Sequence, residues 1–320
     1  MDLVNSVPIL GSCLNDLGRC ADILSIGLFN GLIVALVAMG YTLVYGILQL
    51  INFAHGDVFM TGTMLTFFGV TLLGLSSRTE PVVLIVAMAG ILVVVMTITA
   101  TLNSTIERVA YRPLRNAPTL ATLIAAIGMS FVLQNVGIFL LGPSPRALPD
   151  ILPSTPIIRF SGVSIGFDEI FVAAIAVPLL IGLAWFVRST RQGKAMRATA
   201  QDREAAGLMG VDVNRTIAIT FVLAGALAGG AGLIVALFNG QTQWNYGFNY
   251  GLLSFTSAVF GGIGNLVGAA LGGVLLGLLK ALVDSYVDPR WTDIAVFGIL
   301  VLVLVFRPTG LLGAATSERA

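Results

Sequence analysis

Long runs without a charged side chain alternate with short charged segments along the chain. The runs that contain no Asp, Glu, Lys, Arg or His cover residues 23–54, 58–77, 81–106, 116–145, 170–187, 216–279 and 294–306. A helix that crosses a bilayer needs about 20 mainly apolar residues, so the run 216–279 has room for three crossings. The pattern predicts an all-α, polytopic membrane protein with about eight or nine transmembrane helices, built as a single domain over residues 1–320.

The composition indicates the same class of protein. Hydrophobic residues make up 57% of the chain and charged residues 10%, whereas soluble domains contain roughly 25% charged residues. The mean hydropathy is +0.95. A chain of 320 residues with so few charges cannot cover a water-exposed surface, and its net charge of +1 gives no reason to expect a nucleic-acid partner. We therefore expect the lipid bilayer to surround most of this chain.

The charged segments predict the orientation, because Lys and Arg are retained on the cytoplasmic side of a membrane. Segments 107–115 and 188–215 carry three and six basic residues and are expected in the cytoplasm. Acidic residues outnumber basic ones in segments 142–169 and 284–293, which are expected outside. These assignments alternate only if residues 250–283 enter the membrane and return, with a broken helix or a re-entrant hairpin. The N-terminus is then outside and the C-terminus is cytoplasmic.

Glycine is abundant, with 37 residues, and its spacing is patterned. Glycines four residues apart occur at positions 225 and 229, at 264, 268 and 272, and at 273 and 277. Small residues at this spacing let helix backbones approach closely in a bilayer, where burial of apolar surface drives no association. A second interpretation is that a helix unwinds beside a water-filled path. The candidates for such a helix break or for close packing are Gly261, Gly262, Gly264, Gly268 and Gly272.

The predicted cytoplasmic loop 188–215 is more than a connector. Its segment from Ala195 to Met209 predicts one short amphipathic helix, whose apolar face contains Met196, Thr199, Ala205, Leu208 and Met209. Such a helix could lie on the lipid surface or dock into a groove of a soluble partner, and the pattern by itself leaves both alternatives open.

Within this loop, Glu204, Ala205 and Ala206 are followed after three residues by Gly210. The pattern resembles the EAA-x-x-x-G signature of ABC importer membrane subunits, although the Leu-Pro that usually follows is absent. From about residue 23 to 313 the chain also resembles branched-chain amino acid permeases, and NFAHG resembles their shorter, H-type subunit. Asp57 is a departure, because many relatives carry Glu there. The segments that carry the resemblance are NGLIVALVAMGYTLVYGILQLINFAHGD, YRPLRNAPTLATLIAAIGMSFVLQN, GKAMRATAQDREAAGLMGVDVNRTIAITFVLAGALAG, VFGGIGNLVGAALGGVLLG and FRPTGLLG.

The resemblance implies a permease subunit of an ATP-driven importer in the cell inner membrane, a transport subunit that is not itself an enzyme. Its implied partners are ABC ATPase subunits, a second permease that is identical or homologous, and a periplasmic substrate-binding protein. In that family the loop helix enters a cleft of the ATPase, which assigns ATPase coupling to Glu204, Ala205, Ala206 and Gly210, with Gly210 ending the helix. The chain contains no GxxxxGK[ST] motif, so ATP and Mg²⁺ are expected on the partner ATPases and no cofactor is expected on this chain.

The implied cargo is a branched-chain or related hydrophobic amino acid. Relatives also handle urea, short amides and other small polar solutes, and the sequence does not choose between these cargoes. Polar residues inside the apolar runs are candidates for the substrate path, although each could simply hydrogen-bond a neighbouring helix. These candidates are Tyr41, Tyr45, Asn52, His55, Gln134 and Asn135.

His55 is the single histidine of the chain, and Asp57 follows it in an otherwise apolar region. One His and one carboxylate cannot complete a tetrahedral metal site, so no metal is expected. The pair could be the relay of a proton-coupled secondary transporter, because ionisable groups inside membranes are functional by default. Alternatively, Asn52 and Asp57 mark a polar break that ends one helix and caps the next.

A passive channel, with its filter around residues 261–268, is a third class of protein to consider. Dependence on ATP and copurification with an ATPase distinguish an importer from a secondary transporter and from a channel.

Overall fold

The protein is built almost entirely from helices. The computed structural model describes residues 17–49, 52–115, 117–152, 156–160, 163–307 and 309–313. Seven helical segments in this part of the chain are long and apolar enough to cross a membrane, which confirms an all-α, polytopic membrane protein. These segments contain α3 (Leu17–Leu48), α5 (Pro81–Ile106), α6 (Thr119–Leu141), α7 (Phe167–Ser189), α10 (Val213–Phe238), α12 (Leu266–Tyr286) and α13 (Thr292–Phe306). A further long helix, α4 (Ala54–Leu72), is not among the seven.

Shorter elements complete the described part of the chain. The π-helical turn η1 (Glu107–Tyr111) continues α5, and the 3-10 turn η2 (Pro289–Trp291) precedes α13. The shorter α-helices are α8 (Arg191–Gln201), α9 (Arg203–Leu208) and α11 (Tyr246–Gly261). Short strands form two antiparallel pairs, β1 (Arg146–Ala147) with β4 (Gln241–Thr242) and β2 (Pro156–Phe160) with β3 (Val163–Gly166).

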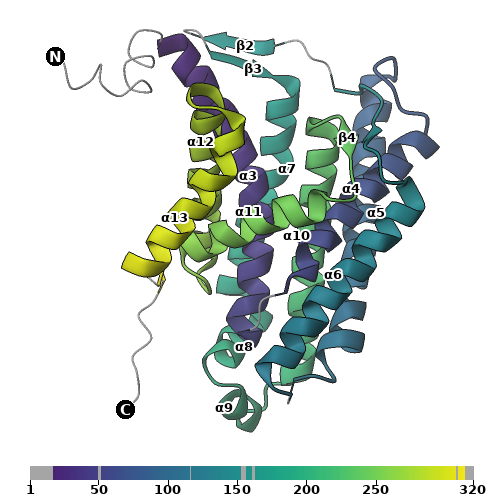
Figure 1. The fold of residues 1–320 in the computed structure, drawn as a ribbon. Coiled ribbons are helices and arrows are strands. Elements are labelled where there is room, and N and C mark those ends of the chain that lie inside the picture. Colours follow the sequence, from purple (N-terminus) through teal and green to yellow (C-terminus); the bar gives the residue numbers. More distant parts are fainter. Residues whose placement is uncertain are drawn as a thin grey trace, which may run out of the picture.

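Figure 1 shows that the two ends of the helix bundle differ. Helices α8 and α9 lie at one end, which we call the loop end, and the β2–β3 hairpin lies at the other, which we call the hairpin end. The two segments expected in the cytoplasm meet at the loop end, where the Arg115 side chain donates a hydrogen bond to Asn214. The turn between α12 and α13, which was expected outside, lies at the hairpin end (Figure 1). The described structure thus groups these segments as the charge pattern predicts.

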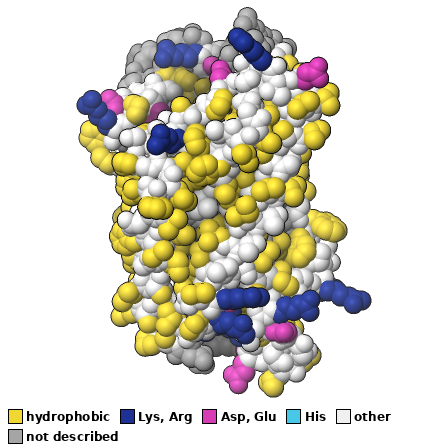
Figure 2. Space-filling model, turned by 90° about the vertical axis from the view of Figure 1, so that its right-hand side faces the viewer, with side chains coloured by type: hydrophobic (Ala, Val, Ile, Leu, Met, Phe, Trp, Pro, Cys, Tyr) yellow, Lys and Arg dark blue, Asp and Glu magenta, His cyan; other side chains and the backbone are white. Residues whose placement is uncertain are grey.

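The surface suits a membrane environment. Figure 2 shows Lys, Arg, Asp and Glu side chains gathered at the two ends of the molecule, with an uncharged band between them. Helices α5 and α6 expose large apolar side chains, among them Val86, Val93, Ile124 and Phe131. Lipid tails solvate such side chains, whereas a continuous apolar surface of this size in water would associate with other molecules.

The run 216–279, expected to hold three crossings, contains α10, α11 and α12. Helix α11 has 16 residues, or a length of about 24 Å at the usual helical rise, which is shorter than the roughly 30 Å hydrocarbon core. Figure 1 shows α11 strongly inclined to the long helices, after which the chain turns back into α12. Within this run, the chain therefore turns back by way of the short, inclined helix α11 and the longer helix α12.

Helix α10 lies at the centre of the bundle. Every residue from Leu227 to Leu237 is buried, and the helix packs against α3, α4 and α5. A Cβ atom added at Gly225 would lie 2.6 Å from the Thr99 carbonyl oxygen of α5, and one added at Gly232 would lie 2.7 Å from the Phe59 carbonyl oxygen of α4. Glycine therefore lets the α10 backbone touch two neighbouring helices at once.

Helices α3 and α12 make the most extensive helix pair in the described chain. A Cβ atom added at Gly31 would lie 2.7 Å from Cα of Val274, and one added at Gly273 would lie 2.5 Å from Cα of Ala35. Gly277 faces the Gly31 backbone directly. These residues form a seam in which backbone lies against backbone, so van der Waals contact holds the two helices together.

The break between α11 and α12 lies at two glycines with left-handed backbone, Gly262 (φ 110°) and Gly264 (φ 92°). The carbonyl oxygens that end α11 are satisfied by the chain after α13: Leu311 N–H donates to the Phe260 oxygen (2.9 Å) and Leu312 N–H donates to the Gly261 oxygen (3.0 Å). The break is thus closed by protein backbone. Beyond it, Gly261 meets Gly268, and Gly272 meets the backbone of Ser257, where α11 and α12 pack together.

We predict that Gly277→Ala destabilises the protein by about 1–3 kcal/mol, because its methyl group would overlap the Gly31 backbone. The measurement is the free energy of unfolding of the purified protein in detergent. The matched control is Gly90→Ala on α5, where an added Cβ meets no atom of the described chain within 4 Å. Equal stability of the two variants would contradict a tight α3–α12 seam.

Candidate functional site

The loop between α7 and α10 folds as two helices, so the prediction of one helix over residues 195–209 is wrong. The chain is extended at Asp202 (φ −157°), between α8 and α9. The Asp202 Oδ1 atom accepts hydrogen bonds from the N–H groups of Glu204 and Ala205, both at 2.9 Å. The short acidic side chain therefore stops α8 and caps α9, an effect that competes with helix continuation.

The C-terminal end of α9 lies just before Gly210, as the sequence predicts. Gly210 has left-handed backbone (φ 86°). Its N–H donates to the Gly207 oxygen (3.0 Å), and the Val211 N–H donates to the Ala206 oxygen (3.0 Å). This pair of bonds is the Schellman arrangement that ends many helices, and glycine adopts the required conformation without steric cost.

The tip of the loop presents apolar side chains to the outside. Leu208 and Met209 are each 85% exposed, and Glu204 beside them on α9 is also exposed. Ala206 is buried and holds α9 against the rest of the protein. The predicted apolar face is therefore divided, because Met196 of α8 is buried in the core while the two residues at the tip are free to contact a partner.

Arg203 joins this loop to the end of α3. Its Nη2 and Nε atoms donate to the Ile47 carbonyl oxygen at 2.8 and 3.2 Å. A cation at the C-terminal end of a helix complements the helix dipole and satisfies a carbonyl that has no intrahelical partner. Gln49, two residues further, has left-handed backbone (φ 54°), which is unusual for a side-chain-bearing residue.

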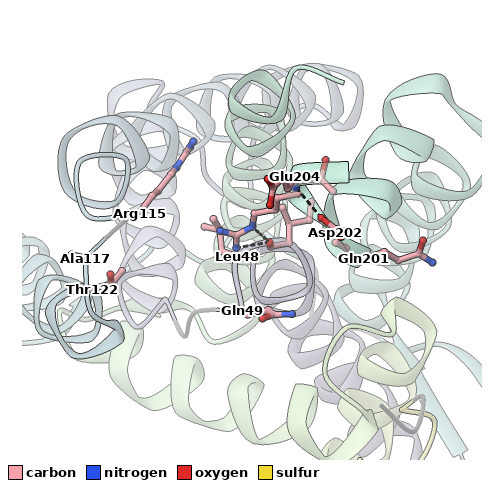
Figure 3. Close-up of a pocket in the computed structure, with 12 residues that line it drawn as sticks. Leu48, Gln49, Arg115, Ala117, Thr122, Gln201, Asp202 and Glu204 are labelled. Carbon is pink, nitrogen blue, oxygen red and sulfur yellow. Dashed lines mark hydrogen bonds between the residues drawn. The ribbon is translucent and has the colours of Figure 1, made fainter. Parts of the chain in front are cut away.

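A cavity of about 490 Å³ lies between the loop and the bundle (Figure 3). Asp202 and Glu204 lie on one side of it, the end of α3 with Gln49 on another, and Arg115 on a third (Figure 3). Burial, and secondarily the positive charge of Arg115, lower the pKa of Arg203 in the wall of this cavity. The guanidinium groups of Arg203 and Arg115 repel one another, which raises the free energy of the loop in this position.

A buried ion pair balances part of that charge. Arg115 contacts the Glu107 carboxylate, whose side chain is 2% exposed, and also donates to Asn214 at the start of α10. The pair therefore links η1 to α10 beneath the loop. Arg203, Glu107 and Arg115 were not singled out in the sequence, where each is one of many charges in a basic loop.

A second cavity, of about 280 Å³, lies between α3, α4, α6 and α11, and its wall extends to the exposed side chains of Phe131 and Phe248. Its polar side chains are Tyr41, Asp57, Ser130 and Gln134, and most of the remaining wall is apolar. Gly247 and Gly251 of α11 face Asp57 and Tyr41, and their missing side chains bring α11 close to α4. The sequence drew attention to Asp57 as a helix-start residue and as half of a possible proton relay with His55, and nothing in it pointed to Ser130, Gly247 or Gly251.

The predicted path residues divide into three groups. Tyr41 and Gln134 line the 280 Å³ cavity, and Tyr45 and Asn52 lie beside a small gap next to Tyr41. His55 is fully buried against Tyr41, with ring centroids 4.7 Å apart, and does not line the cavity. The side chain of Asn135 is exposed on another face of α6, where it donates to the Phe131 oxygen (2.8 Å).

The polar break around His55 exists, but its side chains do not cap the helix. Helix α3 ends at Leu48 and α4 begins at Ala54, with Asp57 in the first turn of α4. Asn52 Oδ1 instead accepts a hydrogen bond from the Tyr111 hydroxyl (2.6 Å). Asn52 therefore ties the break to η1 and the loop end. The part of the chain that the structure describes holds no cluster of three or more His, Cys, Asp or Glu side chains suited to a metal ion.

Comparison with known proteins identifies the family. A family model described as "Branched-chain amino acid transport system / permease component" matches residues 23–305. The chain belongs to this permease family. Among its relatives is the "High-affinity branched-chain amino acid transport system permease protein BraD" of Pseudomonas aeruginosa, 40% identical over 91% of this chain and 96% of the relative. The corresponding protein LivH of Escherichia coli K12 is 38% identical over the same shares.

The permease also has a remote structural neighbour. "PsaBC from Streptococcus pneumoniae in complex with Fab" aligns with 90% of this chain and 92% of that chain, at 14% identity and a TM-score of 0.43. A likeness this distant carries no argument about function. The family match confirms the resemblance found in the sequence and makes the permease a multi-pass membrane protein of a transport system.

We predict that Glu107→Ala lowers the free energy of unfolding of the permease by about 3 kcal/mol, because Arg115 would remain buried without its carboxylate. The matched control is Glu80→Ala at the start of α5, an exposed acid that makes no side-chain cap, and it should change stability by less than about 0.5 kcal/mol. A cost of Glu107→Ala as small as that of the control would show that the ion pair contributes no stability.

Proposed function

We propose that this permease is the membrane-spanning subunit of an ATP-driven importer that moves branched-chain or related hydrophobic amino acids into the cell. The observation that carries the proposal is the 38–40% identity, over 91% of the chain, to permeases named for high-affinity branched-chain amino acid transport. Relatives at this level usually share the machinery, whereas cargo can vary among them. The alternative cargoes are urea, short amides and other small polar solutes.

In this proposal the permease lies in the cell inner membrane with its loop end in the cytoplasm. The basic residues of segments 107–115 and 188–215 favour that orientation. The hairpin end then faces outward, where a periplasmic binding protein would deliver the cargo. A second permease, identical or homologous, would complete the translocation path.

Separate ATPase subunits would supply the energy, with ATP and Mg²⁺ bound to them. The permease has no phosphate-binding GxxxxGK[ST] sequence of its own. Helix α9 supports docking of such a partner, because Leu208 and Met209 project from the loop end with the Glu204 carboxylate beside them. An exposed apolar tip next to a charge suits insertion into a groove of a soluble protein. Ala205, Ala206 and Gly210 would keep this helix narrow and short.

Movement of the docked loop has a direct route to the membrane helices. Arg203, next to Glu204, bonds the last turn of α3 through the Ile47 oxygen. The following residues form the break between α3 and α4, and α4 carries Asp57 into the wall of the inner cavity. We infer that closure of the ATPases shifts α9 and, through Arg203, changes the end of α3.

We predict that proteoliposomes containing the permease, its partner permease, the ATPases and the binding protein import radiolabelled leucine only when ATP is present. Valine and isoleucine should compete with leucine, because their apolar side chains are similar in size, and urea should not. Uptake driven by a proton gradient without ATP would instead support a secondary transporter. ATP-driven uptake of urea but not of leucine would move the proposal to the alternative cargo.

We predict that Glu204→Lys combined with Gly210→Asp reduces leucine import at least tenfold, while the permease remains folded. The first change reverses a charge at the docking helix, and the second places a side chain where left-handed backbone is needed (φ 86°). The control is Glu80→Lys, an equal charge reversal at an exposed residue outside the loop. Normal import by the double variant, with the same amount of copurified ATPase, would remove the coupling role from this loop.

A further inference from the structure

The 280 Å³ cavity contains a single ionisable carboxylate, that of Asp57. Asp57 is 1% exposed, and its Oδ1 atom is buried without a hydrogen-bond partner among the described residues. No Lys, Arg or His belongs to the described cavity wall. A buried carboxylate with an unsatisfied oxygen and no cation beside it is costly, and such groups in membrane proteins mark sites for ions or substrates.

The packing around Asp57 holds it in this position. Gly247 of α11 lies directly against the Asp57 side chain, where a Cβ atom would collide with the carboxylate. Asp57 lies in the first turn of α4 and lines the cavity together with residues of α6 and α11. The carboxylate is therefore kept in the cavity wall by close helix packing.

Two hydroxyl groups lie beside the carboxylate, and one of them, that of Tyr41, has a proton available. The Tyr41 hydroxyl oxygen accepts a hydrogen bond from the Gly56 N–H (3.1 Å), which leaves its own O–H free to donate. The Ser130 oxygen accepts from Gln134 Nε2 (3.0 Å), and the Ser130 hydroxyl interacts with the Asp57 carboxylate. The cavity wall thus combines one negatively charged hydrogen-bond acceptor with one free hydroxyl donor.

The rest of the wall is apolar. Phe53, Leu252 and Phe255 line the half-buried part of the cavity, and Ile127, Phe131 and Phe248 line its exposed side. The volume is at the small end of ligand sites in proteins, which suits a small solute. A solute that matches this wall has a cationic group, an anionic group and an aliphatic body.

We propose that this cavity is a binding site for the transported amino acid, in which the Asp57 carboxylate binds the α-ammonium group. The hydroxyl group of Tyr41 donates to its carboxylate, and the phenylalanine-rich wall contacts its aliphatic side chain. The proposal rests on the function proposed above and names the group that recognises the charged end of the cargo. Urea and short amides carry no ammonium group, so the same site disfavours them.

The test is leucine import by proteoliposomes that contain the complete importer, with Asp57→Asn in this chain. The variant keeps the size of the side chain and removes its charge. We expect leucine import per ATP hydrolysed to fall at least tenfold. The matched control is Asp284→Asn on α12, a carboxylate paired with Lys280 (3.0 Å) and absent from this cavity wall, which should import leucine within twofold of the wild type.

A second variant separates recognition from folding. Asp57→Glu keeps the negative charge and should retain more import than Asp57→Asn when both are normalised to the amount of assembled complex. Asp57→Asn with wild-type import per ATP hydrolysed would overturn the proposal, while the function proposed above would stand. Failure of the wild type to import leucine, valine or isoleucine would refute the proposed function itself.

Binding of leucine analogues to the purified complex without binding protein tests the chemistry directly. Leucinamide keeps the ammonium group and should raise the Tm of the wild type but not of Asp57→Asn. 4-Methylpentanoate, which is leucine without its amino group, should raise neither. Equal shifts by both compounds in both proteins would show that the cavity takes any apolar molecule, such as a lipid tail, and would overturn the role of Asp57.

Discussion

Contact between glycine-lined helix backbones is the interaction on which the rest of this structure depends. In a bilayer, lipid tails solvate apolar side chains as well as protein does, so helices associate through close packing and hydrogen bonds. The permease meets this constraint where Gly31 and Gly277 bring α3 against α12, and where Gly225 and Gly232 hold α10 against α5 and α4. The same device brings α11 to α4 at Gly247, next to the inner cavity. Close backbone contacts at glycine therefore account both for the helix packing and for the position of the candidate binding site.

At the loop end, charged side chains hold the helices together, whereas in the membrane interior close contacts at glycine do so. Asp202 divides the loop into two helices, Arg203 bonds the end of α3, and the Glu107–Arg115 pair lies between η1 and α10. These contacts tie an exposed, apolar tip to helices that line the inner cavity. The proposed docking surface on α9 and the proposed binding cavity are thus separated by one helix end and one short break. This arrangement suits a protein that must link the two.

Much of the fold could be predicted from the sequence, because membrane helices follow from where charges are absent. Helix α5 spans the charge-free run 81–106 residue for residue, and the loops group at the two ends as their basic residues indicate. Prediction failed where local chemistry competes with the helix pattern: Asp202 can continue a helix or cap one, and only the surrounding bonds decide. Gln134 and Asn135 are neighbours in the sequence, yet only Gln134 lines the cavity. Helix α6 is apolar on most of its sides, so periodicity could not say which side faces inward.

The sequence by itself determined that this is a polytopic α-helical permease, which family it belongs to and where its loop helix ends, since these depend on composition, motif and local backbone preference. Only the tertiary structure decided that Asp57 faces a cavity with Tyr41 and Ser130, that Arg203 holds the end of α3, and that the break at Gly262 is closed by the chain after α13. Each of these contacts joins residues from different helices. Their meeting is set by which helix faces approach one another, and the order of residues along one helix does not contain that information.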